Sequence, residues 1–76
     1  MIEVNSIGKK CPQPIIDVAR AIGNIPMGES LVLLADDPAT LPDLTAWSRM
    51  TGNAIKILSE TNFLVTRQNQ SGQVPH

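Results

Sequence analysis

The pattern of apolar and polar positions divides the chain into short segments separated by glycine and proline. Apolar side chains that alternate, or follow one another over a few residues, are typical of strands, whereas those that recur at a helical period are typical of amphipathic helices. The pattern predicts strands at 2–6, 31–35, 54–58 and 63–67, and helices at 12–23 and from about 37 or 40 to 52.

The first predicted helix carries a clear apolar stripe. Ile15, Ala19 and Ile22 fall at i, i+4 and i+7, and Asp17 is placed on the side that faces water. Gly23 follows the stripe and is expected to end the helix.

The start of the second helix is open between two positions. Either Asp37 caps it with Pro38 at the first helical position, or Thr40 caps it with Asp43 three residues later. Gly52 can adopt a positive φ and is expected to end this helix in either case.

The resulting order, β-α-β-α-β-β, predicts a fold. A helical crossover joins parallel strands in a right-handed sense, and the final short connection is a hairpin, so the sheet is expected to be mixed. We therefore expect an α/β two-layer sandwich, with a four-stranded mixed sheet, two helices on one face and the other face open to a partner. Residues 1–67 are expected to form a single domain, and residues 68–76 a disordered tail with little to bury.

Composition narrows the function classes. A chain of 76 residues has little room for an enclosed active site. Its six Lys and Arg against seven Asp and Glu argue against direct binding to nucleic acid, which needs a dense basic surface. The acidic start of the chain and the absence of a long apolar run predict a soluble, cytoplasmic protein with no membrane partner.

The only cysteine, Cys11, stands in the motif Cys-Pro-x-Pro. We expect it at the N-cap of the first helix, with Pro12 and Pro14 in the first turn, where a missing amide hydrogen costs nothing. The positive end of the helix dipole, together with Lys9 and Lys10, predicts a lowered thiol pKa and a nucleophilic thiolate. A buried core cysteine is the alternative, but a polar turn is a poor place for one.

What is missing around this thiol limits its chemistry. The only histidine, His76, lies in the expected tail, so a Cys-His hydrolase and a zinc site are both disfavoured, and no cofactor is expected. Position 14 is proline, so there is no Cys-x-x-Cys redox pair. The chemistry that remains is sulfur exchange: the thiol forms a persulfide or mixed disulfide and passes the group to another protein's thiol.

Other polar and aromatic residues are interpreted as structural, functional or both. Asp36 and Asp37 either complement the second helix or form a docking surface for a partner, and Lys9 either solubilises its turn, supports the thiolate or contributes to docking. Trp47 is expected in the core, and Arg67 is expected to be a solvated edge residue.

Together these motifs resemble the TusA/SirA-like family of small sulfur-carrier proteins over residues 2–67. The resemblance implies the same two-layer sandwich and a sulfurtransferase in which Cys11 carries sulfur as a persulfide, with Lys10, Pro12 and Pro14 completing its motif. The chain departs from the family at Asn5, where Asp is frequent, and at Lys9, where an apolar residue is usual. The residues that carry the resemblance are 8–15, 28–29, 35–40, Asp43, Trp47 and 63–67.

The resemblance also implies partners: a cysteine desulfurase or rhodanese-like sulfur donor, and a sulfur-acceptor protein in tRNA thiolation, cofactor sulfuration or sulfur oxidation. A noncatalytic regulatory or RNA-binding module is the alternative, because the topology also resembles the C-terminal domain of bacterial translation initiation factor three. A purely structural subunit is a third, weaker reading.

Overall fold

A computed structural model describes residues 2–68 of the chain. Its elements follow the predicted order, and their bounds lie close to the predicted ones. Most of the tail expected at 68–76 falls outside the described residues. The elements are β1 (Ile2–Asn5), α1 (Gln13–Ile22), β2 (Ser30–Leu34), α2 (Thr40–Thr51), β3 (Ala54–Ile57) and β4 (Asn62–Thr66).

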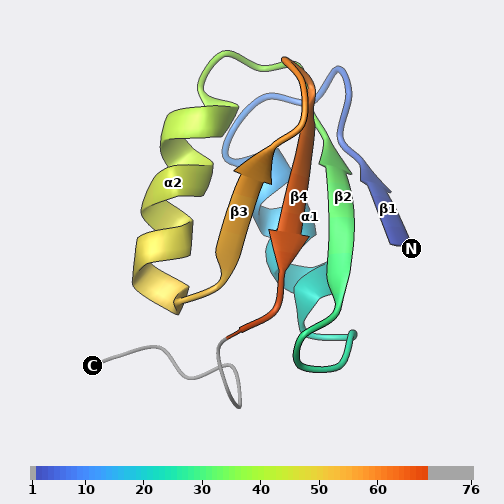
Figure 1. The fold of residues 1–76 in the computed structure, drawn as a ribbon. Helices are drawn as coiled ribbons and strands as arrows, with labels where there is room; N and C mark the ends of the chain where they lie inside the picture. Colours follow the sequence, from blue (N-terminus) through green and yellow to red (C-terminus); the bar gives the residue numbers. More distant parts are fainter. Residues whose placement is uncertain (1, 69–76) are drawn as a thin grey trace.

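The strands form one sheet in the order β1-β2-β4-β3 (Figure 1). β1 pairs with β2 in parallel, while β4 pairs antiparallel with both β2 and β3. The predicted mixed sheet is therefore confirmed. The two crossovers contain the helices, and the connection from β3 to β4 is the predicted hairpin.

The core lies between the two helices and one face of the sheet. On that face Leu31 pairs in register with Val65, and Leu33 pairs with Phe63; all four are buried. Val18 of α1 is among the helix residues that close the core, and Trp47, from α2, packs against it as predicted. Burying one aliphatic side chain of this size contributes about 1.5–3 kcal/mol, so this layer supplies most of the driving force for folding.

Among the described residues, no helix covers the opposite face of the sheet. Val32, Leu34 and Leu64 are partly exposed there. Neither helix within residues 2–68 has the length and apolar character needed to cross a bilayer.

Arg67 closes the end of the sheet where β2 begins and β4 ends. Its guanidinium donates a hydrogen bond of 2.7 Å to the carbonyl of Ile25, just beyond α1. Its backbone amide donates to Glu29 and its carbonyl accepts from Gly28, whose φ is 84°. The expectation of a solvated edge residue is wrong, because the carbonyls that follow a helix need donors and the guanidinium supplies them.

Candidate functional site

Three connections meet at one end of the molecule, at the top of Figure 1: the loop from β1 to α1, the loop from β2 to α2, and the β3–β4 hairpin. Parallel pairing brings the carboxyl ends of β1 and β2 together, as at the sites of other α/β sheets. Backbone hydrogen bonds join the connections, since Ser6 donates to Leu34 at 2.7 Å and Ala35 donates to Thr61 at 2.9 Å.

Cys11 lies in the β1–α1 loop, one residue before the N-cap of α1. The N-cap is Pro12, whose carbonyl accepts the amide of Ile16 at 3.0 Å, and α1 begins at Gln13. The predicted N-cap position of Cys11 is therefore wrong by one residue. Pro14 takes the second helical position, and the Cys11–Pro12 peptide bond is cis.

The loop that precedes α2 holds Cys11 in place. The backbone amide of Cys11 donates to Asp37 Oδ2 at 3.0 Å, and its Sγ lies 3.8 Å from Thr40 Oγ1. Thr40 is fully buried, whereas Cys11 is partly exposed. The sulfur therefore has a fixed polar neighbour on one side and access to solvent on the other.

Asp36 makes the second bond between these loops, because its Oδ1 accepts the amide of Gly8 at 2.9 Å. Gly8 has a φ of 83°, which L-residues with side chains rarely adopt. Sequence reasoning missed that these two acids bind the cysteine loop. The available signal was their position directly after β2, beside the loop that follows the parallel strand β1.

The start of α2 differs from both predicted alternatives. The N-cap is Ala39, without a side-chain hydrogen bond, and Thr40 is the first helical residue. Asp37 instead closes the turn before the helix, since its Oδ1 accepts the amide of Ala39 at 2.8 Å and its carbonyl accepts that of Thr40 at 2.9 Å. One carboxylate thus serves both α2 and the cysteine loop.

The pKa of the Cys11 thiol is raised, not lowered as predicted. Partial burial, which disfavours the charged form, is the largest cause, and the neighbouring carboxylates of Asp43 and Asp37 raise the pKa further. The hydroxyl of Thr40 opposes this shift by stabilising the thiolate. In the isolated chain, with no partner protein bound, the protonated form of the Cys11 thiol is favoured.

The two lysines do not offset these acids at the thiol. Lys9 Nζ forms an ion pair with Asp17 Oδ2 at 3.1 Å. The charge of Lys10 helps to lower the pKa of Asp37, after larger contributions from the amides of Ala39 and Cys11. The predicted support of the thiolate by the lysines is therefore wrong, because both act on carboxylates.

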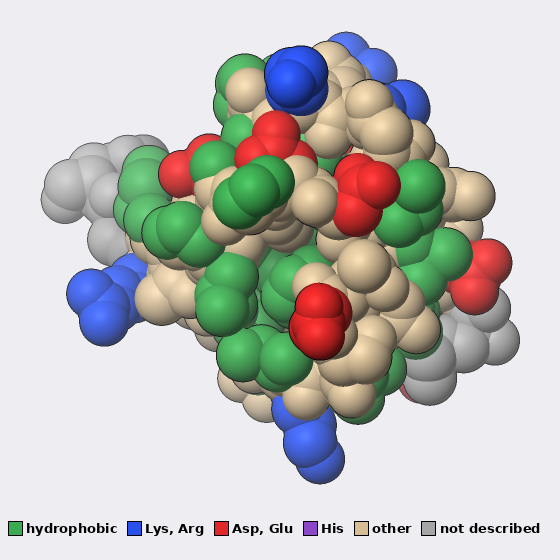
Figure 2. Space-filling view, turned by 90° about the horizontal axis from the view of Figure 1, so that it is seen from above, with side chains coloured by type: hydrophobic (Ala, Val, Ile, Leu, Met, Phe, Trp, Pro, Cys, Tyr) green, Lys and Arg blue, Asp and Glu red, His purple; other side chains and the backbone are tan. Residues whose placement is uncertain are grey.

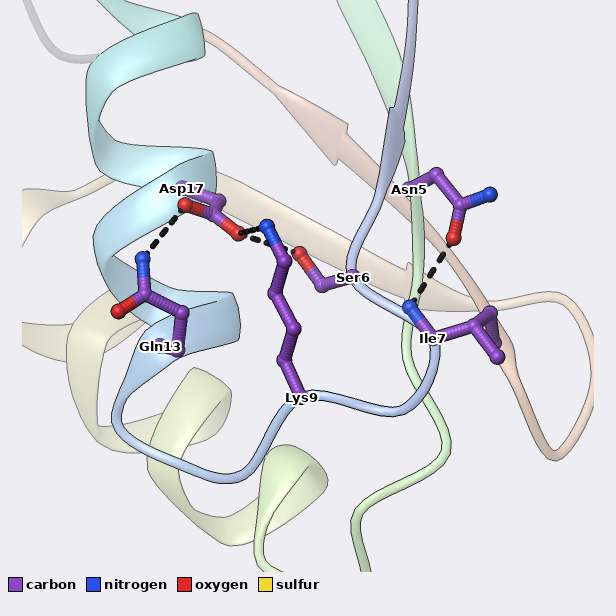
Figure 3. Close-up of polar contacts among 6 residues, drawn as sticks. All are labelled: Asn5, Ser6, Ile7, Lys9, Gln13 and Asp17. Carbon is purple, nitrogen blue, oxygen red and sulfur yellow. Dashed lines mark hydrogen bonds and ion pairs between the residues drawn. The ribbon is translucent and has the colours of Figure 1, made fainter.

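Asp17 gathers the remaining polar contacts around the loop (Figure 3). Besides Lys9, it accepts hydrogen bonds of 2.8 Å from Ser6 Oγ and from Gln13 Nε2. These bonds lower the pKa of Asp17, those of Ser6 and Gln13 most. A residue placed on the water-facing side of the helix thus ties together the end of β1, the loop and the first turn of α1.

Beside the cysteine loop the surface is hollowed. The hollow encloses about 500 Å³ between the start of α2 and the β3–β4 hairpin. Figure 2 views this end from above and shows acidic side chains standing next to hydrophobic ones. Within residues 2–68 no group of three or more His, Cys, Asp or Glu side chains is arranged to hold a metal ion. The hollow is lined by Asp36, Asp37, Pro38, Leu41, Ile57, Ser59, Glu60, Thr61 and Phe63.

The whole described fold corresponds to one known family. The family model described as "Sulfurtransferase TusA" matches residues 2–67. This range includes both helices, all four strands and the loop that carries Cys11. The chain therefore belongs to the TusA sulfurtransferase family, and a general role in carrying or transferring sulfur follows from that membership.

Proposed function

We propose that Cys11 carries sulfane sulfur as a persulfide, which it receives from one protein and delivers to another. The observation that carries the proposal is the placement of the chain's single thiol. It lies on a loop at the end of the sheet, fixed through its own amide by Asp37 and partly open to solvent. A thiol with no second cysteine in the chain can accept sulfur but cannot resolve it into an intramolecular disulfide.

Loading is an exchange in which no external oxidant is needed. The Cys11 thiolate attacks the terminal sulfur of the donor's persulfide, R–S–S–H. A bond forms between Sγ and that sulfur, the donor's S–S bond breaks, and its electron pair leaves with the donor thiolate R–S⁻. The product is Cys11–S–S–H. Delivery repeats the same exchange, with the acceptor's thiolate as the nucleophile and Cys11 as the leaving group.

The surrounding residues have supporting roles in this proposal. Pro12 and Pro14 fix the chain as it enters α1, and Thr40 stabilises the thiolate at the moment of attack. Lys10, through Asp37, helps to keep the loops joined.

Partners complete the site, because the Cys11 side chain is partly open to solvent on its loop. A cysteine desulfurase or a rhodanese-like protein serves as donor, and a thiol-bearing protein, as in tRNA thiolation, serves as acceptor. The acidic side chains at this end disfavour the alternative of an RNA-binding module, since phosphates would be repelled.

The test is loading followed by intact mass measurement. The chain is incubated with a cysteine desulfurase and cysteine, and we expect a gain of one sulfur atom that dithiothreitol removes. Cys11→Ser should gain nothing. An unchanged mass of the wild type, or an equal gain on Cys11→Ser, contradicts the proposal.

A further inference from the structure

The floor of the hollow beside the cysteine loop is apolar and open. Leu41 comes from the first turn of α2, Ile57 from the end of β3, and Phe63 from β4. Leu41 is 38% exposed and Ile57 is 55% exposed, although both stand beside the core residue Phe63. Leu31, Leu33 and Val65 on this side of the sheet are buried, so the hollow is one of the places where the core surface remains uncovered.

The rim of the hollow is acidic. Asp36, Asp37 and Glu60 line it, and the lining includes no lysine or arginine. Apolar floors with a rim of one charge sign favour partners that present an aliphatic side chain next to charges of the opposite sign.

The hollow is contiguous with the cysteine loop. Asp37, on its rim, accepts the amide of Cys11, and Asp36 accepts that of Gly8. On their other side the same two acids line a smaller hollow with Lys9 and Lys10. A protein segment seated in the larger hollow therefore lies next to the loop that presents the sulfur.

We propose that this hollow docks the sulfur-donor protein through a segment that inserts a branched aliphatic side chain between Leu41 and Ile57 and sets Lys or Arg against the acidic rim. The inference rests on the proposed function of Cys11 and adds the chemistry of its partner. The chain's own residues 69–76 contain no Lys or Arg and do not fit this description.

The donor is the partner that the chemistry favours. Loading is the step in which Cys11 must be the nucleophile, yet partial burial and, after it, the carboxylates of Asp43 and Asp37 disfavour its thiolate. A cation placed at the rim offsets those charges while the donor is bound. Docking and activation of the thiol are thus coupled, and the thiol of the free carrier is less reactive than that of the docked one.

Blocked synthetic peptides test the surface without any sulfur transfer. The probe has the sequence Gly-Lys-Leu-Lys-Gly, and the controls replace either both lysines with glutamate or the leucine with serine. In ¹H–¹⁵N and methyl NMR titrations we expect the probe to shift signals of Leu41, Ile57 and Phe63, and each control to bind at least about tenfold more weakly.

Three results of the titration overturn the inference. The first is signal shifts centred elsewhere on the chain, and the second is equal responses to the three peptides. The third is shifts at the hollow that depend on protein concentration without any peptide, which would show that a second copy of the chain occupies it.

Sulfur loading gives a second, independent test with Ile57→Lys. The rate of loading by a cysteine desulfurase is divided by the rate with inorganic polysulfide, which loses one sulfur atom to the thiolate and needs no docking. We expect this ratio to fall at least about tenfold, because a cation in the hollow repels the donor's basic segment. Met50→Lys is the matched control, since Met50 is 61% exposed near the far end of α2.

The outcomes separate the two proposals. A wild type that fails to load even with polysulfide contradicts the role of Cys11, whereas the peptide titration still decides the docking surface. A ratio in Ile57→Lys equal to that of the wild type and of Met50→Lys overturns the docking surface and leaves the role of Cys11 standing.

Discussion

The two helices start at the same end of the molecule, but their first turns differ in charge and in what they do to the thiol. The start of α1 has two prolines and no acidic residue, and it directly follows Cys11 in sequence. The start of α2 is 29 residues away from Cys11 along the chain, yet Thr40 contacts the sulfur and Asp43 lies in its first turn. The distant helix start, together with Asp37 before it, adds to partial burial, the largest cause, in setting the ionisation of the thiol.

The dipole of α1 is too weak at Cys11 to lower the pKa of its thiol. The dipole of a helix contributes about 0.3–1 kcal/mol to a charge at its end and fades within the first turn. Cys11 lies before the N-cap of α1, and the lysines beside it are directed to carboxylates. Partial burial and the charges of Asp37 and Asp43 therefore outweigh the dipole. Parallel pairing of β1 and β2 brings these acids to the thiol.

The largest expected effect is on stability and comes from Asp17, which binds the β1–α1 loop. Asp37 and Asp43 instead raise the pKa of the Cys11 thiol. Asp17→Ala removes the acceptor of the fully buried Ser6 hydroxyl and of two other donors. We expect the free energy of unfolding to fall by about 1–3 kcal/mol at pH 7, measured by urea denaturation. Unchanged stability would show that these bonds contribute nothing net.

Asp17→Asn is the matched control, since it keeps an acceptor but loses the charge. The folded-state pKa of Asp17 is lowered, so the stability it contributes is present above its unfolded pKa of about 4 and is lost as the pH falls below it. The difference between wild type and Asp17→Asn should therefore shrink towards low pH. A difference that grows on acidification contradicts this linkage.

The next effect tests the contribution of α2 to the thiolate. Thr40→Val keeps the shape of a buried side chain but removes the hydroxyl that lowers the pKa of Cys11. We expect the rate of alkylation by iodoacetamide at pH 7 to fall about tenfold, because hydrogen bonds to charged groups contribute about 1.5 kcal/mol or more. A rate equal to that of the wild type would show that the Thr40 hydroxyl of α2 does not stabilise the Cys11 thiolate.

A smaller change in the opposite direction is expected for Asp37→Asn. The amide keeps one oxygen for either the Cys11 or the Ala39 amide, loses the second acceptor, and removes a negative charge that raises the pKa of the thiol. Alkylation at pH 7 should speed up by about fivefold at most, because two charges in water interact by about 1 kcal/mol at 4 Å.

The pH dependence of Cys11 alkylation tests the direction of the pKa shift independently. The raised pKa of Cys11 means that reactivity grows as the pH increases through that pKa, and Asp37→Asn should move the profile to lower pH. Asp36→Asn is the control, since Asp36 binds Gly8 and does not contribute to the pKa of Cys11. Equal shifts in both variants would point to loosening of the loop instead of a charge effect.

The smallest effect concerns the ion pair at the start of α1. Lys9→Ala removes the pair with Asp17, in which Lys9 is about half exposed. We expect a loss of at most about 1 kcal/mol in unfolding free energy, and less in high salt. A clear loss of thiol reactivity at constant stability would restore the thiolate-supporting role first predicted for Lys9.

The architecture was predictable from the sequence because it depends on periodicity and on punctuation by glycine and proline. The apolar period that predicted α1 and the positive φ of Gly52 were both local signals, although Ala19 of the predicted stripe is exposed and Val18 is buried in the core. The fold class needed only the order of the elements and the rule for crossovers. No long-range contact had to be known.

The site was predictable only in part. The motif drew attention to Cys11, and its role as sulfur carrier stays a prediction. The direction of its pKa was wrong because sequence neighbours, Lys9 and Lys10, were taken as spatial ones. The bond from Asp37 to the cysteine loop depends on how two loops pack, and the bond from Ser6 to Asp17 depends on how the β1–α1 loop folds back on α1; no local pattern encodes either.

The two ends of the sheet are built in different ways. At the end away from Cys11, the Arg67 guanidinium donates to the carbonyl of Ile25, and the Arg67 backbone forms main-chain hydrogen bonds with Gly28 and Glu29. At the Cys11 end the β3–β4 hairpin exposes Ser59 and Glu60, while buried side chains such as Ser6 and Thr40 lie in or beside the other connections. Residues 58–60 can therefore be varied with little loss of foldability, which makes this hairpin a practical place to change the surface beside the cysteine loop.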